Sequence, residues 1–110
     1  MEYVEVGRVE EVPPGKGTVF TVSKKELAIF NVNGTFYAMD NACLHQGLSL
    51  GTSRLDGKIV TCRGHGWRYD VTTGSTLHVP GYGVTTYPVR IMDGKICVAI
   101  LFPHPNPGET

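Results

Sequence analysis

Two short segments of the chain each combine a cysteine with a nearby histidine. Cys43-Leu-His45 and Cys62-Arg-Gly-His65 are separated by 16 residues. Thiolate and imidazole groups bind soft and borderline metal ions, and two such pairs supply four ligands. A lone cysteine or histidine usually has only a structural role, but two matched pairs are hard to explain by chance. They predict a metal centre whose candidate ligands are Cys43, His45, Cys62 and His65.

The alternation of cysteine and histidine favours an iron–sulfur cluster over zinc. A cluster of two irons and two sulfides needs four terminal ligands, and in one type two cysteines hold one iron while two histidines hold the other. Zinc sites more often pair cysteine with cysteine and histidine with histidine, so a zinc-binding structural module is the second hypothesis. Glycines beside the ligands suit a backbone that bends tightly and approaches the sulfides: Gly47, Gly64 and Gly66.

Both pairs follow segments that we expect to be β-strands. Thr35–Met39 precedes the first pair, and Lys58–Thr61 precedes the second. Loops at the ends of strands can converge on one site and are held rigidly there. The sequence therefore predicts two ligand loops, at about residues 41–49 and 62–70.

The remaining pattern predicts a small antiparallel all-β protein. Further β-branched and apolar runs are Gly17–Val22, Glu26–Val32, Val89–Met92 and Lys95–Ile100. Three dipeptides, Asn33–Gly34, Asp56–Gly57 and Asp93–Gly94, are typical of tight hairpin turns. No window keeps a helical period of 3.6 residues.

Size and charge limit the possible functions. The 110 residues fit a single domain over 1–110, with a proline-rich, weakly ordered tail at about 102–110. Ten basic residues balance ten acidic ones, so nothing indicates binding to nucleic acid or to an anionic membrane. The acidic residues crowd the N-terminus at Glu2, Glu5, Glu10 and Glu11, whereas Arg54, Lys58, Arg63 and Arg68 lie in the middle.

The compartment that these features predict is the cytoplasm. The sequence contains no signal peptide and no run approaching the ~20 apolar residues of a membrane span. Its three cysteines are too few and too irregularly spaced for a secreted disulfide framework. We expect Cys97 to be a buried structural thiol.

The two ligand segments resemble the two cluster-binding boxes of Rieske proteins. The matching stretches run from Cys43 to Leu50 and from Cys62 to Asp70, with Thr73–Gly74 following. The resemblance covers nearly the whole chain and is to the small Rieske ferredoxins of bacterial aromatic-ring dioxygenases and toluene-type monooxygenases. It implies stacked antiparallel sheets with the two loops at one tip, and one 2Fe–2S cluster.

The resemblance also implies a function. Such a protein is an electron carrier and not an enzyme, and it passes single electrons from a ferredoxin reductase to a terminal oxygenase. A carrier that docks on two partners in turn is most simply a monomer. A second hypothesis is the Rieske-like small subunit of an assimilatory nitrite reductase, although such subunits often lack the ligands. The oxygenase itself would need a further iron site, for which only His78 and His104 remain.

Differences from the cytochrome bc type bear on the potential. That type has an extra cysteine in each box, at the positions of Leu48 and Gly64, and the two form a disulfide beside the cluster. It has a serine hydroxyl donor at the position of Trp67, whereas Tyr69 matches its tyrosine donor. Fewer hydrogen bonds to the cluster predict a potential near the low end of roughly −150 to +300 mV.

Three features near the boxes have more than one interpretation. Trp67 is either a core aromatic under its loop or an exposed anchor for a partner. Arg63 is either solvated or, with the other central basic residues, steers an acidic partner. The proline-containing stretch His78–Gly83 is expected to cover the cluster, with His78 in a supporting role.

Overall fold

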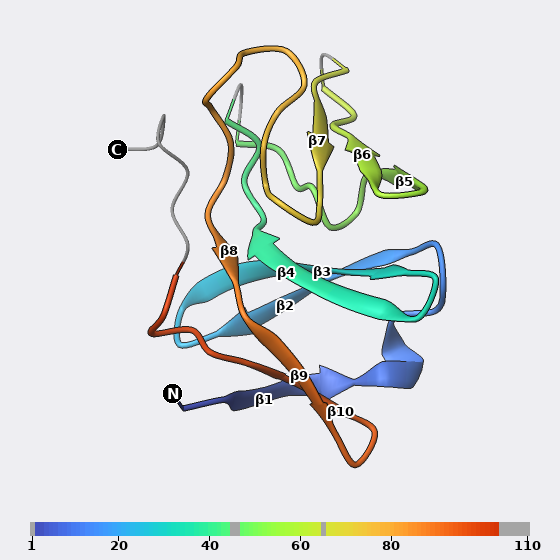
Figure 1. Cartoon of the computed structure of the whole chain (residues 1–110), viewed down its shortest axis with the longest axis vertical. Coiled ribbons are helices and arrows are strands. Elements are labelled where there is room, and N and C mark those ends of the chain that lie inside the picture. The colour runs from blue at the N-terminus through green and yellow to red at the C-terminus, as the bar shows by residue number, and fades with distance from the viewer. Residues whose placement is uncertain (1, 45–46, 65, 104–110) are drawn as a thin grey trace.

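Three antiparallel sheets stacked in layers form the framework of the protein (Figure 1). The computed structural model describes residues 2–44, 47–64 and 66–103. The base sheet has the order β1 (Val4–Arg8), β10 (Lys95–Val98), β9 (Val89–Met92). The central sheet has the order β2 (Gly17–Val22), β3 (Lys25–Val32), β4 (Thr35–Asp40), β8 (Thr86–Tyr87). The third sheet has the order β5 (Arg54–Asp56), β6 (Ile59–Thr61), β7 (Arg68–Asp70).

The predicted all-β, antiparallel fold is confirmed. In the described ranges the single helical element is the short 3-10 helix η1 (Val9–Glu11). Those ranges contain no helix that is both long and apolar enough to cross a membrane.

The central sheet is buried on both faces because successive strand residues point to opposite sides. On β3, Leu27 and Ile29 enter one core, and Ala28 and Phe30 enter the other. The base core, against β1 and β10, contains Val12, Leu27, Ile29, Ala38, Tyr87, Ile96 and Val98. The cluster-side core, against β6 and β7, contains Ala28, Phe30, Met39, Cys43, Leu50, Val60, Cys62, Tyr69, Val71 and Val84. A strand buried on both faces requires a continuous apolar run, which Leu27–Phe30 supplies.

Tight turns set the register of the hairpins. Asn33–Gly34 and Asp93–Gly94 occupy the two-residue turns that the sequence predicts. The φ angles are 52° for Asn33 and 94° for Gly34, and 52° for Asp93 and 75° for Gly94. The predicted Asp56–Gly57 turn is shifted by one residue, because Asp56 pairs with Ile59 and leaves Gly57–Lys58 as the turn. The turn between β2 and β3 is Ser23–Lys24, a dipeptide that is not typical of a tight hairpin turn.

Some predicted strand ends are wrong. The last strand stops at Val98 and not at Ile100. The Ala99 N–H still donates to the carbonyl of Pro88 at 3.0 Å, in register with the ladder, but Pro88 has no N–H with which to return the hydrogen bond. Strands β1, β5, β7 and β8 were not predicted. Most of the predicted tail, residues 104–110, lies outside the described residues.

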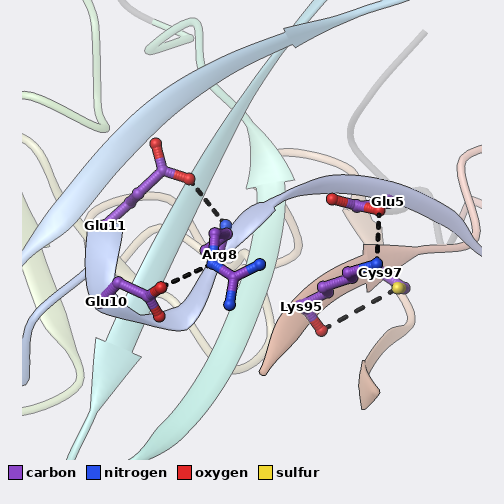
Figure 2. A network of polar contacts seen from close by, with 6 residues as sticks. All are labelled: Glu5, Arg8, Glu10, Glu11, Lys95 and Cys97. Carbon is purple, nitrogen blue, oxygen red and sulfur yellow. Dashed lines mark hydrogen bonds and ion pairs between the residues drawn. The ribbon is translucent and has the colours of Figure 1, made fainter. Parts of the chain in front are cut away.

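Acidic groups gather at the base of the molecule (Figure 2). The Arg8 N–H donates to Glu11 at 2.7 Å, and the Arg8 side chain pairs with Glu10 at 2.6 Å. Lys95 pairs with Glu5 at 3.7 Å beside Cys97, which is 3% exposed. The prediction that Cys97 is a buried thiol is confirmed, and it forms no disulfide.

Candidate metal centre

The two ligand loops lie at the same end of the molecule, away from the base sheet (Figure 1). The first follows β4, and the second connects β6 to β7. Their cysteines, Cys43 and Cys62, are each 2% exposed and belong to the cluster-side core. The other two predicted ligands, His45 and His65, lie outside the described residues.

The first loop holds the backbone of its cysteine from both sides. The Cys43 N–H donates to the Leu48 carbonyl at 2.9 Å, and the Cys43 carbonyl accepts from the Gly47 N–H at 2.7 Å. Gly47 has a φ of 70°. That left-handed conformation is costly for residues with a Cβ, which explains the glycine.

The second loop repeats this pattern at the same spacing. The Cys62 N–H donates to the Trp67 carbonyl at 2.7 Å, and the Cys62 carbonyl accepts from the Gly66 N–H at 3.1 Å. Gly66, four residues after its cysteine as Gly47 is, has a φ of 75°. The two loops therefore share one backbone arrangement, which holds the main chain of both cysteines in the same way.

Tyr69 places a hydrogen-bond donor beside a candidate ligand. Its hydroxyl lies 3.3 Å from the sulfur of Cys43 and accepts a hydrogen bond from the Leu44 N–H at 3.0 Å. A hydroxyl that already accepts has its hydrogen available for the sulfur. Burial raises the pKa of Tyr69, and the neighbouring Cys43 raises it further, so the donor stays protonated. The sequence prediction that Tyr69 serves as the donor agrees with this geometry.

The two thiols lie close enough to influence each other. Burial raises the pKa of Cys62, and Cys43 raises it further, while the backbone of Gly64 and the charge of Arg63 lower it. Two buried thiolates need a compensating positive charge, and a bound metal centre supplies one. The donor set therefore fits a cysteine-ligated iron.

A third loop packs beside the second one. The Leu77 N–H donates to the Arg68 carbonyl at 2.9 Å, and the ring centroids of Trp67 and His78 lie 5.8 Å apart. Trp67 is half-buried and packs against the cluster-side core, whereas His78 is exposed. The core interpretation of Trp67 agrees with this packing.

A polar cluster that no sequence motif predicts lies beneath the first loop. A groove of about 720 Å³ is lined by Ser23–Glu26, Asp40–Leu44 and Gly47. At its edge the Tyr87 hydroxyl donates to Asp40 at 2.6 Å, and Lys25 approaches the same carboxylate at 3.4 Å. Burial and the Asp40 hydrogen bond raise the pKa of Tyr87 to about 12. No local motif joins these residues, because the chain brings them together only through the pairing of β3, β4 and β8.

The family of this chain follows from its similarity to known proteins. The family model of the Rieske 2Fe-2S domain matches residues 2–88. The chain belongs to the Rieske 2Fe-2S family, and the cofactor of this family is one Rieske-type 2Fe–2S cluster. The zinc hypothesis is therefore set aside.

Relatives place the chain among the ferredoxins of this family. It is 34% identical over 98 residues to the ferredoxin component of the naphthalene 1,2-dioxygenase system of Pseudomonas aeruginosa, covering 88% of this chain and 94% of that protein. It is 30% identical over 111 residues to the ferredoxin component of the alkene monooxygenase system of Xanthobacter autotrophicus, covering 99% and 89%. These proteins are ferredoxin components, so the chain is an electron carrier and not an enzyme, and the nitrite reductase hypothesis is disfavoured.

A solved structure agrees with this class. One chain in the complex of reduced oxygenase and oxidized ferredoxin in carbazole 1,9a-dioxygenase aligns with a TM-score of 0.79 and 28% identity. The alignment covers 88% of this chain and 92% of that chain.

Proposed function

We propose that this ferredoxin takes single electrons from a ferredoxin reductase and delivers them to the terminal oxygenase of a multicomponent system. The dioxygenase and monooxygenase systems of its relatives support this assignment, as does the complex of an oxygenase with a ferredoxin. The observation that carries it is the arrangement of the tip, where two buried cysteines lie beneath loops with exposed apolar side chains.

Those side chains suit transient contact with a partner protein. Leu44, Leu77 and Tyr82 are 40%, 51% and 46% exposed, and they come from the first and third loops. Apolar and aromatic groups near the centre of an interface contribute much of the binding energy. A partner that docks on the tip would therefore come close to the sulfur ligands.

Reconstitution tests the proposal directly. The holoprotein is mixed with NADH, a candidate ferredoxin reductase and a candidate terminal oxygenase, and product formation is measured with and without the ferredoxin. We expect product only with all three proteins. Product at the same rate without the ferredoxin would contradict the carrier role.

The ligand set is a second part of the proposal. Cys43 and Cys62 would hold one iron, and His45 and His65 would hold the other. The matched hydrogen bonds of the two loops support the cysteines.

The chain offers matched controls for this assignment. Replacing any of the four ligands by alanine should abolish the visible absorption, the electron paramagnetic resonance signal on reduction and the bound iron. Cys97→Ala and His104→Ala remove the same kinds of side chain at positions outside the two ligand segments and should keep all three. Loss of iron from a control variant, or its retention in a ligand variant, would contradict the assignment.

We further propose that residues 1–110 form one domain, that the protein works as a monomer and that it is cytoplasmic. The two cores shared by the central sheet support a single domain. The absence of disulfides among its three cysteines is typical of a reducing compartment. Size-exclusion chromatography with light scattering tests the monomer, and cell fractionation tests the location.

A further inference from the structure

We propose that Arg54, Arg63 and Arg68 form a basic docking strip beside the second cluster loop, and that this strip binds an acidic patch on the partner protein with which the ferredoxin exchanges electrons. The inference rests on the proposed electron-carrier function and specifies the surface chemistry of the partner. Net charge alone gives no sign of it, since the chain is formally neutral.

The register of the third sheet puts two of these arginines on one face. Arg54 pairs with Thr61, and Thr61 pairs with Arg68, so the three side chains form a row across the sheet. Strands lie about 4.8 Å apart, which separates the two arginines by roughly 10 Å. The neighbouring positions Leu55, Val60 and Tyr69 face the opposite way, into or against the cluster-side core.

This row is close to the proposed ligands. Thr61 ends β6 and is followed directly by Cys62, while Arg68 begins β7 where the same loop ends. Arg63 follows Cys62 and is exposed, as are Arg54 and Arg68. A partner bound along the strip would therefore lie beside the second cluster loop.

The arginines of the strip lack acidic partners, unlike most of the other basic residues. Lys16 and Lys24 also form no ion pair in the described residues, but neither belongs to the third sheet. Four basic residues form ion pairs, namely Arg8, Lys25, Lys58 and Lys95, and Arg90 lies 4.7 Å from the ring centroid of Tyr3. In the part of the chain that the structure describes, the three arginines of the strip form no ion pair. Lys58, which the sequence groups with them, is excluded because it pairs with Asp70 at 3.4 Å.

Charge is also separated along the molecule. Glu5, Glu10 and Glu11 lie at the base, at the opposite end from the cluster loops (Figures 1 and 2). On the face of the strip itself, Asp56 and Asp70 occupy the row farther from the loop. Glu5 and Glu10 are paired with Lys95 and Arg8, so the positive charge at the loop end comes from the unpaired arginines of the strip themselves. Steering by such a local charge raises association rates by about 10- to 1000-fold.

Small redox ions measure the sign of this field without any partner protein. The reduced holoprotein is mixed with ferricyanide or with hexaamminecobalt(III), and one electron passes from the protein to each oxidant, giving ferrocyanide or hexaamminecobalt(II). The test variant is Arg54→Gln/Arg68→Gln. Arg63 is left unchanged in it, because Arg63 directly follows the proposed ligand Cys62. The control is Arg90→Gln/Lys95→Gln, which removes the same charge from the base sheet.

The strip predicts a specific pattern of rates. The quantity compared is the oxidation rate with ferricyanide divided by the oxidation rate with hexaamminecobalt(III), both at low salt. Relative to the wild type, this ratio should fall by roughly threefold or more in the test variant. In the control it should change by less than about twofold. High salt should reduce the difference, because charges are screened over about 10 Å at 0.1 M. Equal ratios in the two variants would overturn the strip.

A binding measurement and a partner measurement complete the test. On a carboxymethyl resin, the oxidised test variant should elute at lower salt than the control, whereas co-elution would count against the strip.

With a reductase that reduces the wild type, the test variant should be reduced more slowly and with a weaker salt dependence. Equal reduction of all three proteins at every salt concentration would overturn the proposed docking while leaving the carrier function intact. If no reductase reduced the wild type, the carrier proposal would fail and the ratio of ion rates would decide the strip.

Discussion

Tyr69 is the residue whose position most directly affects the proposed centre. Its hydroxyl meets the Cys43 sulfur while a backbone N–H fixes its orientation. A hydrogen bond to a sulfur ligand stabilises the more negative, reduced form and so raises the reduction potential.

Removing this hydroxyl should lower the potential. In Tyr69→Phe the ring still fills the cluster-side core, but the sulfur loses its donor. If this hydrogen bond is about 1 kcal/mol stronger in the reduced form than in the oxidised form, its loss lowers the potential by roughly 40 mV for one electron. We expect a decrease of roughly that size in a spectroelectrochemical titration of the holoprotein. Tyr87→Phe, which removes another buried hydroxyl bonded to Asp40, should leave the potential within experimental error, and an equal decrease in both variants would contradict the assignment to Tyr69.

Asp70 makes a pH-dependent contribution to stability. Burial by itself would raise the pKa of Asp70, but hydrogen bonds from Thr72 and the charge of Lys58 outweigh burial and hold it below its ordinary value of 3.8. The Thr72 hydroxyl and N–H donate to the carboxylate at 2.6 Å and 2.9 Å.

A carboxyl whose pKa is lower in the folded state stabilises the fold above its unfolded pKa and loses this effect as the pH falls through its folded pKa. Asp70→Asn should therefore lower the free energy of unfolding by about 1–3 kcal/mol at pH 7. The gap to the wild type should start to close as the pH falls to about 4 and should close below the folded pKa. Urea unfolding between pH 2 and 7, an interval that includes the ordinary pKa of 3.8, measures this difference. A gap of constant size across that range would contradict the role of the charge.

Residue-level prediction from sequence succeeded where a motif fixed the neighbours. Tyr69 was identified because it stands at a set distance from Cys62 in the second box. The polar group of Lys25, Asp40 and Tyr87 carries no such signal, since its members are brought together by strand pairing over up to 47 residues. His45 and His65 lie outside the described residues, so their ligand role stays a prediction.

Among the elements, the β2–β3 turn has unfavourable backbone angles. Ser23 and Lys24 have φ of 51° and 66°, in the region that favours glycine and asparagine. The other hairpins with this turn use Asn33–Gly34 and Asp93–Gly94. The Ser23–Lys24 turn therefore stores strain that a different sequence would relieve.

A better turn sequence should stabilise the fold. Ser23→Asn/Lys24→Gly should raise the free energy of unfolding by roughly 1 kcal/mol, measured by chemical denaturation of the holoprotein. Lys16→Gly is the control, because Lys16 does not have a positive φ and added backbone freedom there should be destabilising. If both variants shifted the stability in the same direction, the strain argument would be wrong.

Strands were predictable from sequence where a strong turn signal or a continuous apolar run marked them. β3 and its hairpin with β4 have both. β1 has neither, because it contains Gly7 and a register shift there and pairs with β10 from the other end of the chain. β5, β7 and β8 have only two or three residues each, which is too short for a period to appear.

At the scale of the whole molecule, the two cluster loops are joined without a disulfide. Leu48 and Gly64 occupy the positions of the cysteines that link the loops in the cytochrome bc type, and Trp67 replaces a hydroxyl donor. We therefore expect a midpoint potential toward the low end of roughly −150 to +300 mV in a redox titration. A value above about +200 mV would contradict this expectation.

Charge distribution is the whole-molecule property that sequence predicted only in outline. The concentration of acidic residues at the N-terminus and of basic residues in the middle was visible. The sequence could not separate Lys58 from Arg54 and Arg68. Lys58 lies in the turn between β5 and β6, within reach of Asp70, whereas Arg54 and Arg68 lie in the row next to the loop, and only the strand pairing shows this difference.

The burial of β3 on both faces also affects what happens to the fold when the cluster is lost. Leu27 and Ile29 belong to the base core, whereas Cys43 and Cys62 belong to the cluster-side core, and no residue is shared between the two. Oxidative loss of the iron would thus remove support from one side of the central sheet and leave the packing on the other side in place. We therefore expect the apoprotein to keep the packing of the base core and to regain its visible absorption when iron and sulfide are added back. An apoprotein that unfolds as a whole would contradict this expectation.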